Sequence, residues 1–97
     1  MVVGVKGLRA EVMAAPRADR LEYALGLLYV RAKNYIQAEQ ALKAAIQDDN
    51  QNASYLYAYL LTLDALNQRE KAKTILSSSP LTKNDPLLSK LLIAWGE

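Results

Sequence analysis

The chain has 97 residues, with 12 Lys and Arg against 10 Asp and Glu, and it contains no Cys and no His. The missing Cys and His exclude disulfides, thiol chemistry, histidine acid–base catalysis and the usual zinc sites. Ala and Leu dominate, Phe is absent, and Gly and Pro are few, which is typical of a single all-α domain over residues 1–97.

The charged residues do not indicate a nucleic-acid or membrane partner. Lys and Arg are scattered along the chain without a basic run or a basic face. No stretch reaches the roughly 20 apolar residues of a membrane span, so we expect a soluble chain. Its compartment stays open between cytoplasm and periplasm, because a chain without Cys fits either.

Apolar spacing predicts about six helices along the chain, over residues 4–15, 19–32, 35–47, 53–66, 69–77 and 87–96. Asp85 and Pro86 form a strong helix start, because a capping side chain is followed by a residue already fixed at helical φ. Asn34 and Asn52 are the expected caps of two other helices. Pro80 should end the fifth helix early and leave an irregular link before the last one.

The sequence resembles itself with a 34-residue period. The identities in this alignment are Tyr23–Tyr57, Ala24–Ala58, Leu27–Leu61, Ala38–Ala72, Leu42–Leu76 and Asn50–Asn84. Because they fall on small and large packing positions of two helices at once, we infer a helical repeat. We expect the units at residues 4–18 (the second helix of an earlier, partial unit), 19–52, 53–86 (a degenerate copy) and 87–97 (a terminal helix).

The first full unit predicts a close pair of helices. Gly26 lies on one face of the first helix together with Leu25 and Tyr29. The stripe on the next helix, at i, i+4 and i+7, consists of Ala38, Leu42 and Ala45. A small residue on each helix lets the two axes approach closely, and the bulky neighbours fill the space beside them.

This pattern at this period resembles the tetratricopeptide repeat. The first full unit matches best, and the second keeps Leu63, Ala72 and Leu76 but carries Leu60 where the family prefers Gly. The resemblance implies a right-handed solenoid of antiparallel helix pairs, whose first helices line a concave groove. Such repeats are interaction modules, so the resemblance also implies a protein or peptide partner held in that groove.

On the family's geometry, twelve residues are expected to face the groove. They are Arg20, Tyr23, Leu27, Val30, Arg31, Ser54, Tyr57, Leu61, Asp64, Leu88, Leu91 and Trp95. The family's Lys, Asn and Arg clamp for a C-terminal carboxylate is absent, so we expect an apolar and aromatic groove. Tyr23 and Tyr57 either contact the ligand or pack between neighbouring first helices, and both interpretations stay open. Arg20 and Arg31 either attract a mildly acidic partner or are ordinary surface charge.

The last predicted helix is strongly apolar for a terminal element and contains Leu87, Leu88, Leu91, Leu92 and Trp95. One face should pack on residues 53–77 as a cap, while the remainder leaves apolar surface for self-association or for further repeats. The predicted helix over residues 4–15 also lacks the first helix of its unit. Together these features suggest a segment of a larger protein. The rival function is therefore a self-associating or structural segment that docks through residues 4–15 and 87–96.

The sequence offers no candidate catalytic or cofactor site. Its carboxylates are spread over predicted helix surfaces and turns, and Asp48 and Asp49 close a helix, where such groups are usually solvated. No nucleophile has a base beside it, and neither a Gly-rich phosphate loop nor metal-ligand spacing occurs. We therefore expect a non-enzymatic scaffold for protein–protein interaction, without cofactor or metal.

Overall fold

The computed structural model describes residues 17–96, so the predicted helix over residues 4–15 lies outside the described part. Its five helices are α2 (Arg17–Arg31), α3 (Tyr35–Asp48), α4 (Ala53–Ala65), α5 (Arg69–Ser78) and α6 (Pro86–Gly96). Each bound lies within two residues of the prediction from the sequence. The all-α class and the helix spacing are thereby confirmed, and no strand occurs between residues 17 and 96.

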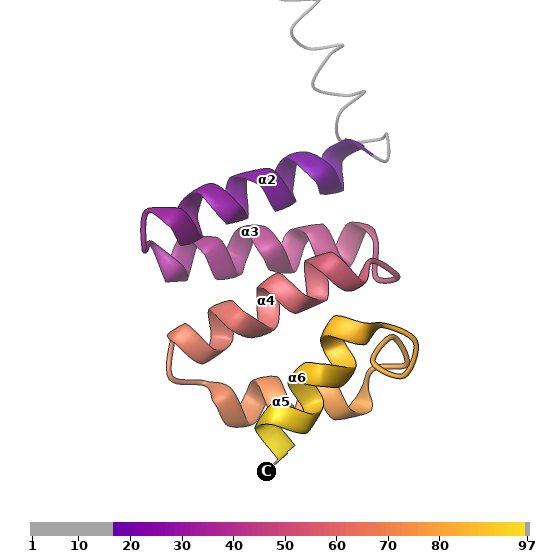
Figure 1. The fold of residues 1–97 in the computed structure, drawn as a ribbon. Helices are drawn as coiled ribbons and strands as arrows, with labels where there is room; N and C mark the ends of the chain where they lie inside the picture. Colours follow the sequence, from indigo (N-terminus) through magenta and orange to yellow (C-terminus); the bar gives the residue numbers. More distant parts are fainter. Residues whose placement is uncertain (1–16, 97) are drawn as a thin grey trace, which may run out of the picture.

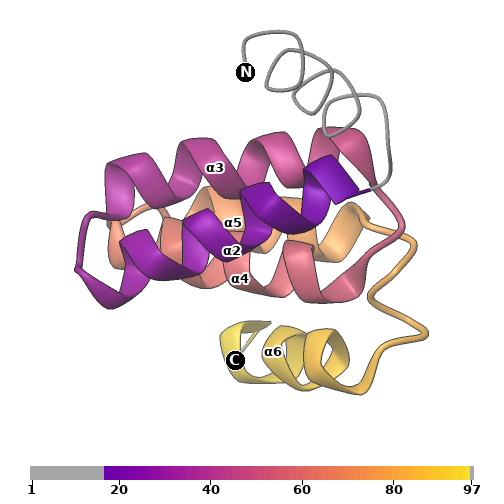
Figure 2. The same ribbon diagram turned by 90° about the horizontal axis from the view of Figure 1, so that it is seen from above.

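The helices form a stack in chain order, in which each helix packs on the next one (Figure 1). Seen from above, α3 and α5 lie on one side, α2 and α4 lie next to them, and α6 lies beyond α4 (Figure 2). α2 and α4 also contact each other directly, and α6 contacts both α4 and α5. The first helices of the two hairpins are therefore neighbours.

The expected helix caps are present at two of three places. The Asn52 side chain accepts hydrogen bonds from two backbone amides in the first turn of α4, at 2.9 and 3.2 Å. Asp85 accepts one from the Leu88 amide at 3.0 Å at the start of α6. The expectation for Asn34 is wrong, because its side chain makes no cap bond. Only its backbone carbonyl bonds into the helix, accepting from the Ala38 amide at 2.9 Å.

The turns that end α2 and α4 repeat each other in detail. Lys33 and Asn67, which are equivalent in the 34-residue period, both adopt the left-handed conformation with φ of 64°. In each turn the next amide donates to a carbonyl five residues earlier, from Asn34 and from Gln68, at 2.8 Å in both cases. This is the hydrogen bond that closes a Schellman C-terminus. The period is therefore a property of the backbone as well as of the sequence.

The close approach of α2 and α3 is confirmed at Gly26. A Cβ added there would lie 2.7 Å from Cγ and Cδ2 of Leu42, closer than carbon atoms can approach. Ala38, Leu42 and Ala45 are completely buried. The prediction that Leu25 packs with them is wrong, because its side chain is 45% exposed. Leu25 precedes Gly26 by one residue and so points about 100° away around the helix.

The main core lies between α4, α5 and α6. Its completely buried large side chains besides Leu42 are Leu60, Leu63, Leu76 and Leu88. On α6, Leu88 and Trp95 face this core, so the expected packing of the terminal helix on residues 53–77 is present. Leu87 and Ile93 are 52% and 66% exposed, which leaves apolar surface on the other side of α6.

The irregular link predicted after Pro80 spans residues 79–85. It is held by Thr82, which is 3% exposed and donates its hydroxyl to the Leu76 carbonyl at 2.6 Å. The Thr82 carbonyl in turn accepts from the Ser89 hydroxyl at 2.6 Å. Thr82 therefore satisfies a carbonyl at the end of α5 and joins the link to α6.

Candidate partner-binding pocket

A pocket of about 400 Å³ lies between α2 and α4. Its lining consists of Tyr23, Leu27 and Val30 from α2, Tyr35 from α3, and Tyr57, Ala58, Leu61, Thr62 and Ala65 from α4. None of these side chains is charged, and three are tyrosines. The pocket thus combines a large apolar contact area with a few phenol groups.

The repeat explains why these side chains share one place. On α2 the spacing i, i+4, i+7 puts three of the lining residues on one helix face, and the 34-residue period puts Tyr57 and Leu61 on the same face of α4. Ala58 and Ala65 are small, so space remains between the larger side chains. Leu27 and Leu61 are 39% and 40% exposed, which keeps the pocket accessible from outside.

Tyr23 also packs within the stack. Its ring centroid lies 4.8 Å from that of Tyr55, with the two planes tilted by 36°. The two interpretations left open for Tyr23 are therefore compatible, because one side of the ring contacts α4 while the residue still lines the pocket.

A buried polar pair lies next to this aromatic contact. The Tyr55 hydroxyl donates to Oδ2 of Asp19 at 2.6 Å, and the two residues are 3% and 6% exposed. Burial, together with the hydrogen bond and negative charge of Asp19, raises the pKa of Tyr55 to about 12. The expectation that Asp19 lies on a helix surface is wrong. Its carboxylate instead ties the start of α2 to α4 and supports the pocket wall at Tyr23.

A second carboxyl on α2 also turns inward. Burial is the largest cause that raises the pKa of Glu22 to about 7, and hydrogen bonding to Asp48 and the charges of Asp48 and Asp19 contribute the rest. One oxygen of Glu22 and one of Asp19 are buried without a hydrogen-bond partner. The acidic side chains of α2 therefore face the neighbouring helices, while Arg20 and Arg31 on the same helix are exposed.

Seven of the twelve predicted groove residues do not line the pocket. Arg20, Arg31 and Ser54 are exposed beside it, and Leu91 packs partly buried against the core. For Leu88 and Trp95 the prediction is wrong, because they are 0% and 9% exposed within the core. α6 does not continue the repeating pattern of α2 and α4, because it turns this face inward after the link that contains Pro80.

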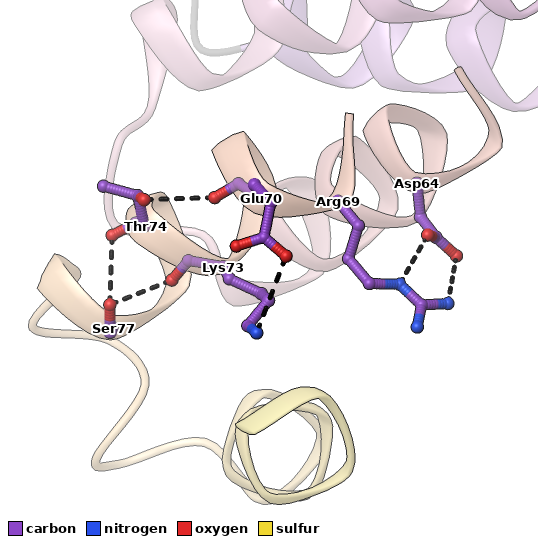
Figure 3. A network of polar contacts seen from close by, with 6 residues as sticks. All are labelled: Asp64, Arg69, Glu70, Lys73, Thr74 and Ser77. Carbon is purple, nitrogen blue, oxygen red and sulfur yellow. Dashed lines mark hydrogen bonds and ion pairs between the residues drawn. The ribbon is translucent and has the colours of Figure 1, made fainter. Parts of the chain in front are cut away.

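The remaining predicted residue, Asp64, is held in an ion pair. The Arg69 Nε and Nη2 atoms donate to its two carboxylate oxygens at 2.7 and 3.2 Å (Figure 3). The hydrogen bond from Arg69 lowers the pKa of Asp64. The guanidinium carbon also lies 5.5 Å from the Trp95 ring centroid. Arg69 thus links α4, α5 and α6, and Glu70 and Lys73 form a looser pair beside it at 3.8 Å.

Sequence reasoning missed four lining residues, Tyr35, Ala58, Thr62 and Ala65. The prediction considered first helices only, and Tyr35 enters from the first turn of α3, directly after the turn that reverses the chain. Thr62 donates its hydroxyl to the Ala58 carbonyl at 2.8 Å, so that group is already bonded within the helix. A position next to a tight turn is the one signal that would have identified Tyr35.

The described residues give no indication of a metal site or a membrane span. Between residues 17 and 96, His, Cys, Asp and Glu form no group of three that fits a metal ion. None of the helices α2 to α6 combines the length and apolar character needed to cross a bilayer.

Comparison with known proteins assigns the chain to a family. The family model described as tetratricopeptide repeat matches residues 29–93, more than half of the chain. The chain belongs to the tetratricopeptide repeat family. Tetratricopeptide repeats are non-catalytic and generally mediate protein–protein interactions. Searches among curated proteins and among solved structures gave no significant match.

Proposed function

We propose that this tetratricopeptide repeat protein is an interaction scaffold that holds an apolar segment of a partner protein in the pocket between α2 and α4. The observation that carries the proposal is the lining itself, nine neighbouring side chains without a charge and with two exposed leucines at the opening. An apolar or aromatic anchor side chain of a peptide or helix fits such a pocket, whereas a free carboxylate finds no cation in it.

The surroundings of the pocket favour a partner with acidic residues next to its anchor. Arg20 and Arg31 are exposed on α2, whereas Asp19 and Glu22 of the same helix are turned toward α3 and α4. Arg20 and Arg31 therefore give the surface of α2 beside the pocket a positive charge. Opposite charge on the partner speeds association and fixes its orientation, more than it raises affinity.

The test is selection of binding peptides from a displayed library of random sequences, followed by titration of one selected peptide. We expect selected peptides to share an apolar residue flanked by Asp or Glu. Leu61→Glu places a charge in the pocket and should weaken binding at least about tenfold, equivalent to about 1.4 kcal/mol. Ile93→Glu is the matched control, since Ile93 is exposed on α6 outside the pocket. Equal affinity for both variants would refute the pocket as the binding site.

The exposed side of α6 supports a second candidate function, self-association. Leu87 and Ile93 are apolar and more than half exposed, although α6 buries Leu88 and Trp95. Sedimentation velocity over a concentration series tests this candidate, with Ile93→Glu expected to shift any dimer to monomer. A change at Trp95 would not serve, because that side chain belongs to the core. A monomer at all concentrations would exclude this function.

A further inference from the structure

α2 carries an apolar face that neither α3 nor the pocket uses. It consists of Leu21, Leu25 and Leu28, spaced i, i+4 and i+7, and we call it the outer leucine row. These side chains are 54%, 45% and 57% exposed. Three adjacent leucines on one helix face form the kind of contiguous apolar surface that marks an interaction site. α2 lies at the end of the described stack (Figure 1), so no helix between residues 17 and 96 covers the row.

The equivalent face of α4 shows what covers such a row in the next unit. In the 34-residue period, the outer leucine row corresponds to Tyr55, Tyr59 and Thr62 of α4, which are only 3%, 7% and 2% exposed. These residues are buried because the hairpin α2–α3 precedes them and packs against α4. Burial and the neighbouring Glu39 of α3 raise the pKa of Tyr59, which places α3 beside this face. The difference between the two rows is therefore the presence or absence of a preceding helix.

We propose that residues 4–15 form that helix and dock on the outer leucine row, as α3 docks on α4. The sequence one period before α3 carries the matching pattern. Within residues 4–15, Leu8 and Ala10 align with the identical Leu42 and Ala44, and the similar pairs are Gly4–Ala38, Gly7–Ala41 and Val12–Ile46. Small or apolar residues thus recur at these five positions, whereas Glu11 takes the place of the completely buried Ala45.

One pair of facing residues changes its character between the two units, and both members change together. The pair formed by Glu39 and Tyr59 corresponds, one period earlier, to Val5 and Leu25. A polar pair is replaced by an apolar pair, so both members change together. Val5 is therefore expected to lie against Leu25, in the middle of the outer leucine row.

Attachment to the same chain favours this occupant over a second copy. The segment ends at the residue before Pro16, and α2 begins at Arg17. A link this short gives an effective concentration in the mM range, above the protein concentrations at which a second copy would compete. Gly4 and Gly7 are poor helix formers, so formation of this helix depends on docking.

Thiol labelling tests the proposal in the full chain, which has no native Cys. In Leu25→Cys, docking should slow labelling at least about tenfold relative to Ile36→Cys, whose position on α3 is 62% exposed. Adding Leu8→Asp should restore fast labelling at position 25 and leave position 36 unchanged. Circular dichroism checks that each variant keeps its helix content. Equal labelling rates without Leu8→Asp, or protection that survives this change, would overturn the proposal.

A second measurement separates the occupants. A short bismaleimide added to Val5→Cys/Leu25→Cys should give a cross-linked monomer, and Val5→Cys/Leu27→Cys is the control because Leu27 lines the pocket on the opposite side of α2. Cross-linked dimers only, or protection that disappears on dilution, would instead identify a second copy and refute docking of residues 4–15. The proposal does not depend on the pocket, since Leu61→Glu should leave both results unchanged.

Discussion

Replacement of Gly26 by Ala tests the closest contact in the fold. In a helix interior, Ala is favoured over Gly by about 1 kcal/mol, so propensity alone predicts stabilisation. The structure predicts the opposite, because the new Cβ would lie 2.7 Å from two carbons of the completely buried Leu42. Overpacking of this kind costs about 1–3 kcal/mol. The sum is a free energy of unfolding that falls by up to about 2 kcal/mol.

The decisive measurement is the same substitution in a Leu42→Ala background. That change removes the two carbons against which the Cβ would clash, so Gly26→Ala should now raise the free energy of unfolding, by about 1 kcal/mol. Urea denaturation followed by far-UV circular dichroism measures all four proteins of the cycle. A Gly26→Ala effect of the same sign in both backgrounds would refute the contact between these two residues.

Four further substitutions have outcomes fixed by the structure. Tyr55→Phe leaves the buried Asp19 carboxylate without its donor and should lower the free energy of unfolding by about 1–3 kcal/mol in urea denaturation. Glu22 has its pKa raised from 4.5 to about 7, so its protonated form stabilises the fold. This stabilisation is complete below about pH 4.5 and is lost as the pH rises through about 7. The melting temperature should therefore fall between pH 5 and pH 8, and Glu22→Gln should abolish that part of the fall. Lys33→Gly relieves a left-handed φ and should raise the free energy of unfolding by up to about 1 kcal/mol, whereas Asn67→Gly should gain less because Asn tolerates this conformation.

The repeat period was sufficient to predict most of the fold. It located the helices and indicated the small residue at Gly26 against Leu42, both of which the structure contains. It did not predict the exposure of Leu25, because that depends on which helix lies beside α2. It also failed for α6, where a seven-residue link lets the helix depart from the period and bury Leu88 and Trp95. The sequence pattern shows which residues share a face of a helix. The burial of that face in the first and last helices of the stack depends on which helices lie beside it.

Only part of the pocket and its surroundings was predicted, for the same reason. Equivalent positions on α2 and α4 identified Tyr23, Leu27 and their counterparts Tyr57 and Leu61. The pair of Asp19 and Tyr55 had no such signal, since the period aligns them with Ala53 and Leu21, which form no comparable pair. Contacts between unlike positions of successive units are visible only once the helices are placed in space.

The matching turns after α2 and α4 make the two hairpins interchangeable at their bends. In residues 29–34 and 63–68, the left-handed residue stands at the same position, and the closing hydrogen bond is 2.8 Å long in both turns. A chimera that carries either hexapeptide at both sites should therefore keep both hairpin angles. Length, direction and curvature of such a stack can then be designed by copying a single joint rather than by redesigning each bend.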